Sequence, residues 1–242
     1  MTQPLLQISS VSKRFGGFAA VSDVSLDVRR GERLGIIGPN GSGKTTLINC
    51  VCGTLHSDGG SIRFDGTDVT RIASYKRTRL GMARSFQIPR PFASMTVAEN
   101  VVVPLEYVAH RRSLHAADVR NEALAILGQM GLAALADAPA GALTQVELRK
   151  LELARALAGR PSLLILDEVM AGLSSVEVDE VLGIVLRLND QGMTIIMIEH
   201  IMRAIMRFSE RVVCLDAGRI MAEGPPQQIA SDATVRRIYL GV

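Results

Sequence analysis

The sequence predicts an α/β fold built on a parallel sheet, with an added strand-rich part and a helical layer. Three observations support this prediction. The first third contains short alternating strands and one helix that follows a glycine loop. The middle is dominated by helical patterns, and the last third alternates between buried strands and amphipathic helices. Strands that alternate with helices are typical of a parallel sheet.

The first third predicts strands around one helix. Residues 21–28 (VSDVSLDV) carry apolar side chains at every second position, as in a half-buried strand. Residues 33–38 (RLGIIG) read as a short apolar strand that ends in glycine. Residues 44–53 (KTTLINCVCG) predict a helix that the final glycine closes, and residues 61–66 (SIRFDG) predict a strand and a turn.

The middle of the chain predicts helices. Thr96 stands three residues before Glu99, which is the spacing of a capping box, so a helix is expected to begin there. Pro104 is expected to kink or end that helix. Residues 116–132 and 146–159 carry apolar side chains at helical spacing, and the second segment is stopped by Gly159 and by the proline after Arg160.

The last third alternates between strands and helices. Residues 161–168 (PSLLILDE) form a continuous apolar run, as expected for a parallel strand that is buried on both faces. Residues 175–192 predict an amphipathic helix, and residues 192–200 (GMTIIMIEH) predict a second buried strand. Residues 211–224 resemble a hairpin around the DAG turn.

Composition narrows the class of protein. The 242 residues are 48% apolar, with a net charge of +3, which by itself argues for neither a nucleic-acid nor a membrane partner. No signal-peptide pattern is present at the start, and no apolar run approaches the ~18 residues that cross a bilayer. We therefore expect a soluble cytoplasmic protein; if it works at a membrane, another chain must do the spanning. Its three cysteines are expected to be reduced core thiols.

A phosphate-binding loop is the strongest motif. Residues 38–45 (GPNGSGKT) match the G-x-x-x-x-G-K-[ST] pattern and lie between a predicted strand and a predicted helix. Glycines let backbone N–H groups wrap phosphates, Lys44 can reach the β- and γ-phosphates, and the Thr45 hydroxyl can bind Mg²⁺. A plain glycine-rich turn is the weaker alternative. The expected ATP-binding residues are Gly38, Pro39, Asn40, Gly41, Ser42, Gly43, Lys44, Thr45 and Thr46.

Polar residues at two strand ends complete the predicted site. Asp167 ends a buried strand, at the sheet edge where ligands bind, and is expected to hold Mg²⁺ through water. Glu168 is then placed to act as the base for the attacking water. An ordinary strand end that precedes a helix is the alternative. His200 follows another strand end and joins the site if the two strands are neighbours; otherwise it is a surface or helix-cap residue. Gln87 alone signals little.

With the phosphate loop, Gln87, Asp167-Glu168 and His200 in this order, the chain resembles the ATPase subunits of ATP-binding-cassette (ABC) transporters over nearly its whole length. The resemblance implies that Gln87 contacts Mg²⁺ and the attacking water, near the membrane subunits. It implies that His200 clamps the γ-phosphate and that Phe15 stacks on adenine.

The resemblance also implies the domain organisation. It predicts one ABC ATPase domain over residues 5–240, with a P-loop NTPase core, an antiparallel β subdomain and an inserted helical subdomain. Residues 1–88 and 160–242 are expected to form the nucleotide-binding core with the β subdomain. Residues 89–159 are expected to form the helical subdomain, including the signature helix.

The family signature, usually L-S-G-G-Q, is altered in this chain. It binds the γ-phosphate held by the other subunit of a dimer, and residues 143–147 read LTQVE here. Thr144 keeps a hydroxyl, and Thr144-x-x-Glu147 predicts a capping box that still begins the helix. Val146 is expected to obstruct close approach, and Glu147 would repel phosphate unless it folds back. The hypothesis is that Thr144 senses phosphate with a weakened contact; the alternative is a helix cap only. Gly172 and Ser174 match the loop that crosses to the partner.

Finer features resemble one branch of the family. Residues 81–103, the segment LDEVMAGLS at 166–174 and the ending IYLGV are similar to the ATP-binding subunits of branched-chain amino acid importers, the LivG/LivF group. The resemblance implies ATP and Mg²⁺ as cofactors and a second cassette, identical or not, as a partner. Transmembrane permeases are implied as direct partners and a periplasmic binding protein as an indirect one, with no nucleic acid. The expected location is the cytoplasmic face of the inner membrane.

Three other functions stay open at this point. The ATPase subunits of lipopolysaccharide exporters and of urea or amide importers are similar to those of branched-chain amino acid importers, so either kind of transporter is an alternative. A soluble cassette that acts on ribosomes or DNA usually has two cassettes or long coiled coils, and neither is seen in this sequence. A regulator that binds nucleotide without hydrolysis is compatible with the altered signature, although Asp167, Glu168 and His200 argue against it.

Overall fold

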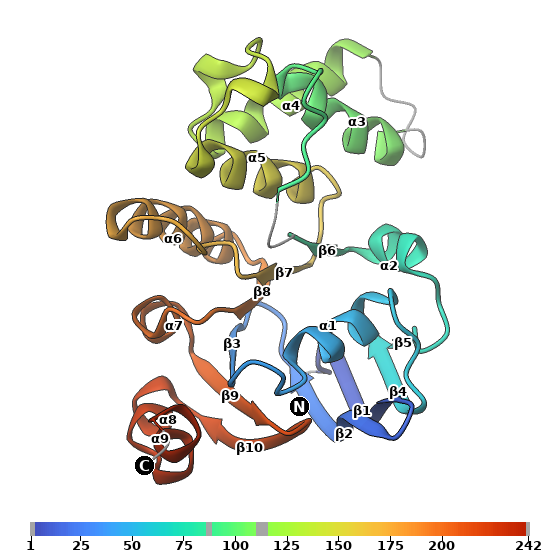
Figure 1. The fold of residues 1–242 in the computed structure, drawn as a ribbon. Helices are drawn as coiled ribbons and strands as arrows, with labels where there is room; N and C mark the ends of the chain where they lie inside the picture. Colours follow the sequence, from blue (N-terminus) through green and yellow to red (C-terminus); the bar gives the residue numbers. More distant parts are fainter. Residues whose placement is uncertain (1–2, 86–88, 110–115, 241–242) are drawn as a thin grey trace.

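The computed structural model describes residues 3–85, 89–109 and 116–240 (Figure 1). Within these residues the strands form a four-stranded sheet in the order β2-β1-β4-β5 and a six-stranded sheet in the order β10-β9-β3-β8-β7-β6. The first sheet is antiparallel; in the second, all neighbouring strands are parallel except β9 and β10. The predicted α/β fold is confirmed.

The bounds of the elements follow the chain. The strands are β1 (Leu6–Phe15), β2 (Phe18–Val28), β3 (Arg33–Ile37), β4 (Gly59–Phe64), β5 (Thr67–Asp68), β6 (Met82–Arg84), β7 (Leu163–Asp167), β8 (Thr194–Ile198), β9 (Arg211–Asp216) and β10 (Arg219–Gly224). The helices are α1 (Lys44–Cys52), α2 (Ser74–Leu80), α3 (Val97–Ala109), α4 (Ala116–Gln129), α5 (Gln145–Leu157), α6 (Ser175–Asp190), α7 (Met202–Phe208), α8 (Pro226–Ser231) and α9 (Ala233–Leu240). Short 3₁₀ turns cover Ala133–Leu135 and Ala140–Ala142.

The six-stranded sheet separates two hydrophobic cores. Along β7, Leu163 and Ile165 face the core shared with the antiparallel sheet and α1. Leu164 and Leu166 face the other core, which is packed against α3 to α7. Successive strand residues point to opposite faces, so an all-apolar strand is buried on both sides. This is the arrangement that the apolar run at 161–168 predicted.

Local signals for helix ends are largely confirmed. Gly53, in the left-handed conformation, caps the end of α1 as predicted. Thr96 and Glu99 exchange the two hydrogen bonds of a capping box at the start of α3. Pro104 does not end α3, which continues to Ala109. β9 and β10 form the predicted hairpin, with Asp216 opposite Arg219.

The helices α3, α4 and α5 lie together beyond one end of the six-stranded sheet (Figure 1). Contacts of α3 with α4 and of α5 with both hold this group together. The antiparallel sheet and α1 lie on one side of the six-stranded sheet, and α6 and α7 lie on the other (Figure 1). The division of the chain at residues 88 and 160 stays a prediction, as does the outer limit of 5–240.

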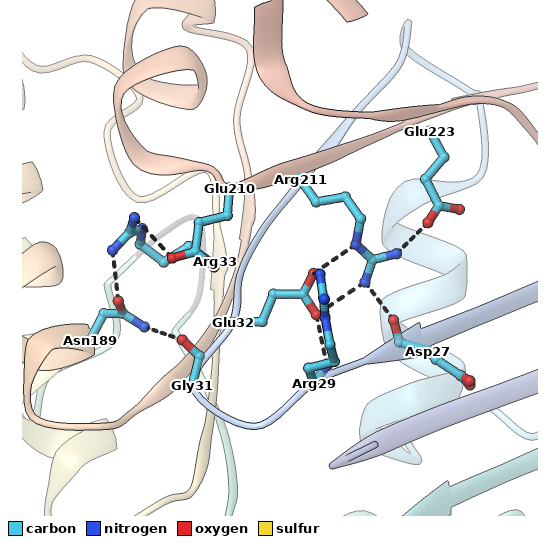
Figure 2. A network of polar contacts seen from close by, with 9 residues as sticks. All are labelled: Asp27, Arg29, Gly31, Glu32, Arg33, Asn189, Glu210, Arg211 and Glu223. Atoms are coloured by element: carbon cyan, nitrogen blue, oxygen red, sulfur yellow. Dashed lines mark hydrogen bonds and ion pairs between the residues drawn. The ribbon is translucent and has the colours of Figure 1, made fainter. Parts of the chain in front are cut away.

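An ion-pair network ties the two sheets together (Figure 2). Arg211 of β9 donates to Glu32 Oε1 at 2.6 Å, to Glu32 Oε2 at 3.1 Å and to the Asp27 carbonyl of β2 at 2.5 Å. It also pairs with Glu223 of β10. The Arg29 N–H donates to Glu32 at 2.7 Å. Burial raises the pKa of Glu32, but the hydrogen bonds from Arg211 and Arg29 lower it more, so the pKa lies below its ordinary value.

The low pKa of Glu32 predicts acid-sensitive stability. The folded-state pKa is depressed, so the carboxylate stabilises the fold above the unfolded pKa, and this contribution is lost as the pH falls through the folded pKa. Glu32→Gln should lower the free energy of unfolding by about 2 kcal/mol at pH 7. Urea unfolding should show that the difference in the free energy of unfolding between wild type and Glu32→Gln becomes smaller below about pH 4.5.

The matched control is Glu210→Gln, which removes an exposed pair with Arg33 at 3.0 Å. It should change the free energy of unfolding by under about 1 kcal/mol. A Glu32→Gln gap that stays constant with pH would show that the carboxylate charge is not what stabilises the network.

Candidate nucleotide-binding site

The phosphate loop connects β3 to α1 and requires its glycines. Gly38 has φ 151° and Gly43 has φ 101°, values that side chains rarely adopt. A Cβ at Gly38 would lie 2.2 Å from the Leu215 carbonyl oxygen, and one at Gly43 would lie 2.3 Å from that of Ala20. Glycine is therefore needed twice over, for its backbone angle and for the close approach of neighbouring chain.

The buried side chain of Lys44 is hydrogen-bonded to the phosphate loop. Its Nζ donates to the Gly38 carbonyl at 2.7 Å and to the Pro39 carbonyl at 2.9 Å. Burial lowers the pKa of Lys44, while the nearby carboxylates of Glu168 and Asp167 act in the opposite direction. A buried cation held against loop carbonyls is placed to exchange them for phosphate oxygens.

A cavity of about 280 Å³, here called the nucleotide cavity, opens beside this loop. It is lined by Phe15, Phe18, Ala20, Asn40, Gly41, Ser42, Gly43, Lys44, Thr45, Thr46 and Glu168. Phe15 lines the cavity and is 49% exposed, so its ring is accessible for stacking with another flat ring. The structure therefore brings most of the predicted ATP-binding residues to one cavity. Gly38 and Pro39 are not among the lining residues, but their carbonyls accept hydrogen bonds from Lys44, which lines the cavity.

The strand ends that carry Glu168 and His200 lie side by side, which is the condition that the sequence prediction set for His200 to join the site. β7 and β8 are parallel neighbours, with Asp167 opposite Ile198, and the Glu168 N–H donates to the Ile198 carbonyl at 2.9 Å. His200 Nε2 lies 2.8 Å from Glu168 Oε1. The predicted base and the predicted γ-phosphate clamp are therefore in direct contact, beside the wall of the nucleotide cavity.

Glu168 is also strained. Its backbone is left-handed, with φ 51°, although it is not glycine. Such a conformation costs roughly 1–2 kcal/mol in an ordinary residue. This left-handed backbone occurs at the position where the base is expected. Residues held in this way often mark functional sites.

Asp167 lies at the end of β7 and is only 5% exposed. One of its oxygens, Oδ2, accepts a hydrogen bond from Arg84 at 2.5 Å. The carboxylate oxygens of Asp167 and the hydroxyl of Thr45 are hard ligands, which suit Mg²⁺. The donor atoms of Asp167, at the end of β7, and of Thr45, in α1, are therefore of the type that fits the predicted metal.

Glu199 is a site residue that sequence reasoning missed. It is 2% exposed, and its Oε1 accepts the Met170 N–H at 2.8 Å, which holds the loop that follows Glu168. Burial raises the pKa of Glu199 to about 7, the hydrogen bond from Met170 opposes this, and the Glu168 charge adds to it. The only signal in the sequence was its position just before His200.

The altered signature forms the predicted capping box. The Glu147 N–H donates to Thr144 Oγ1 at 3.4 Å, and Glu147 Oε2 accepts from the Thr144 N–H at 2.8 Å. The Thr144 hydroxyl also bonds that carboxylate at 2.7 Å. Hydrogen bonds from the Thr144 backbone and side chain lower the pKa of Glu147, so it stays ionised at neutral pH.

Some predicted site residues do not line the nucleotide cavity, and one lies outside the residues that the structure describes. Thr144 is not among the residues that line the cavity. Val146 lies in the first turn of α5 and its side chain packs against the core. It therefore has a helical backbone and does not adopt the left-handed conformation that a glycine could. Gln87 lies outside the described residues. Phe18 and Arg84 were not predicted, and no motif distinguishes them.

Comparison with known proteins gives the family. The sequence pattern described as "ABC transporter" matches residues 21–171. The chain belongs to the ABC transporter family. As an ABC ATPase it is an ATP-hydrolysing subunit. A second pattern, "Branched-chain amino acid ATP-binding cassette transporter", matches residues 219–242. The resemblance found in the sequence is confirmed.

Individual relatives are similar over their full length. The branched-chain amino acid transport ATP-binding protein BraF of Pseudomonas aeruginosa is 36% identical, and the match covers 100% of this ABC ATPase and 99% of BraF. The LivG protein of Salmonella typhimurium is 36% identical with the same coverage. A solved structure, the ADP conformation of the cassette MJ1267, has a TM-score of 0.88, with 31% identity and 100% coverage of both chains.

Proposed function

We propose that this ABC ATPase powers the import of branched-chain amino acids or a similar small polar solute through partner membrane subunits. The contact between Glu168 and His200 beside the nucleotide cavity carries the hydrolytic part of the proposal. Full-length similarity to BraF and LivG supports the class of solute.

The proposed hydrolysis divides the work among named residues. Adenine stacks on Phe15, and Lys44 exchanges its loop carbonyls for phosphate oxygens. Glu168 accepts a proton from the attacking water, and His200 holds the γ-phosphate while fixing the Glu168 carboxylate. Thr45, Asp167 and Gln87 would hold Mg²⁺, which neutralises phosphate charge when bound.

A second cavity supports the proposed membrane partner. This lateral cavity, of about 310 Å³, lies between α2, β6, α3 and α5. Its rim exposes large apolar side chains, among them Phe92 at 43% and Tyr107 at 45%. Exposed aromatic rims beside a cavity are typical of protein-binding surfaces. We propose that a cytoplasmic segment of a permease docks there.

The proposed assembly is a pair of cassettes at the membrane. Within the described residues no helix is long and apolar enough to cross a bilayer. The chain is proposed to sit on the cytoplasmic face of the inner membrane, bound to permeases that receive solute from a periplasmic binding protein. Thr144, which lies apart from the chain's own nucleotide cavity, is proposed to serve the nucleotide of the second cassette.

Reconstitution tests the proposal. The chain is expressed with two candidate permeases and a second cassette, and the complex is placed in vesicles with the binding protein. Uptake of labelled leucine should require internal Mg²⁺ and ATP. Uptake of urea or an amide in place of leucine would change the class of solute. A complex that binds ATP without releasing phosphate would reject the hydrolytic role.

A further inference from the structure

Arg84 lies between the lateral cavity, which it lines, and Asp167, to which it is bonded. It is the last residue of β6, and its guanidinium makes two short bonds. Nη2 lies 2.5 Å from Asp167 Oδ2, and Nη1 donates to Asn49 Oδ1 of α1 at 2.6 Å. The same side chain lines the lateral cavity. Neither the proposed catalysis nor the family resemblance assigns a role to it.

The sheet register explains this position. β6 is the edge strand, and Arg84 stands opposite Ile165 of β7. Asp167 lies two residues further along the same strand, so it projects toward the same face as Ile165 and within reach of a long side chain. The side chains of Arg84 and Asp167 are only 12% and 8% exposed. Their interaction is therefore weakly screened by solvent.

The geometry restrains the carboxylate. A guanidinium presents its donors in a rigid plane, and here one end bonds α1 while the other bonds the end of β7. A lysine has the same charge but a single nitrogen, so it cannot reproduce both bonds in this plane. Groups that hydrogen-bond a metal-binding carboxylate fix its orientation and tune its affinity.

We propose that Arg84 is a positioning residue that orients Asp167 for the divalent cation and links this carboxylate to the lateral cavity. Through that link, filling of the lateral cavity changes metal affinity at the nucleotide site. The inference rests on the proposed role of Asp167 in metal binding and deepens it, because it gives the docking surface a physical connection to the site of hydrolysis.

Metal binding without turnover tests the first part. Mn²⁺ bound to the full chain with ADP is measured by electron paramagnetic resonance. Arg84→Lys should weaken Mn²⁺ binding by about 10–100-fold, with ADP affinity in the absence of metal unchanged. The matched control is Arg155→Lys, on the wall of the same cavity, where Nη1 donates to the Arg90 carbonyl at 2.7 Å. It should bind Mn²⁺ as wild type does.

A second variant guards against misfolding. Asn49→Ala removes the bond between Arg84 and α1 and keeps the charge pair with Asp167, so it should weaken Mn²⁺ binding in the same direction by a smaller factor. If either Arg84→Lys or Asn49→Ala folds and binds Mn²⁺ like wild type, the proposed role of Arg84 is overturned, while the proposed function of the chain is not affected. A wild-type chain that binds neither ADP nor Mn²⁺ rejects the proposed function, and the role of Arg84 with it.

Chemical filling of the lateral cavity tests the link. Val103 is 37% exposed on the cavity wall, so Val103→Cys gives an accessible thiol for a bulky maleimide. The native Cys52 also lines the cavity, but burial raises its pKa to about 11, so it should react slowly. The adduct should change Mn²⁺ affinity several-fold when Arg84 is present and leave it unchanged in Arg84→Lys. An equal effect in both backgrounds, or none in the first, overturns the link.

Discussion

Glu168→Gln should lower ATP turnover by about 100-fold or more, the usual contribution of a general base. Glutamine keeps the shape and can still accept a hydrogen bond from His200, but it cannot take a proton from water at neutral pH. The carboxylate that lies 2.8 Å from His200 is therefore replaced without removing the contact. Binding of ATP should be retained, because Lys44 and the loop glycines are untouched.

The measurements are phosphate release and gel filtration. With Mg²⁺ and ATP, the variant should elute as a stable dimer, since the bound nucleotide is not cleaved. Glu106→Gln, on the exposed face of α3, is the control and should keep wild-type turnover. Turnover of Glu168→Gln within a few-fold of wild type would show that another group accepts the proton.

The sequence predicted only conditionally that Glu168 and His200 belong to one site, and it did not predict their direct contact. Apolar runs identified both strands, and polar residues after them identified the ends. Whether β7 and β8 are neighbours depends on how the chain crosses between them, which local patterns do not encode. The left-handed backbone of Glu168 had no signal either, because glutamate does not favour that conformation.

Local signals were the most successful. The pattern Thr144-x-x-Glu147 predicted a capping box, and the box is present. The same pattern at Ser174 and Glu177 also forms one, at the start of α6. A capping box joins residues three apart, so the residues that decide it lie within one turn of the chain. Tertiary packing has little opportunity to overrule it.

Long-range partners were missed for the opposite reason. Arg84 and Asp167 are 83 positions apart in the sequence, and their pairing requires β6 to lie beside β7. β6 has only three residues, too few for periodicity to reveal. Glu199 looked like an ordinary residue before a histidine. It accepts a hydrogen bond from the Met170 N–H, 29 positions away in the sequence, and local patterns do not reveal such a contact.

The altered signature gives the second large expected effect. Thr144→Ala should lower turnover by about 10–100-fold while ATP binding by the isolated chain stays unchanged. The hydroxyl bonds the Glu147 carboxylate at 2.7 Å, and it can present the same donor to a phosphate oxygen when that carboxylate moves aside. A hydrogen bond to a charged group contributes about 1.5–3 kcal/mol, and each 1.4 kcal/mol corresponds to about tenfold in rate.

Two controls separate phosphate sensing from simple capping. Thr96→Ala removes an equivalent cap on α3, where Thr96 Oγ1 accepts the Glu99 N–H at 3.1 Å. It should cost about 1 kcal/mol of stability, as Thr144→Ala does, without the loss of turnover. Thr144→Ser keeps the hydroxyl and should keep most of the activity. If Thr96→Ala and Thr144→Ala lower turnover equally, residues 143–147 are a helix cap and nothing more.

Glu147 decides how strongly the signature can work. Its ionised carboxylate occupies the Thr144 hydroxyl and N–H, which are the donors that an incoming phosphate needs. Glu147→Gln keeps an acceptor for the capping box and removes the negative charge, so turnover of the assembled complex should rise. A fall in turnover would show that the carboxylate assists the reaction. In that case the replacement of glutamine by glutamate in this signature strengthens the contact across the dimer instead of weakening it.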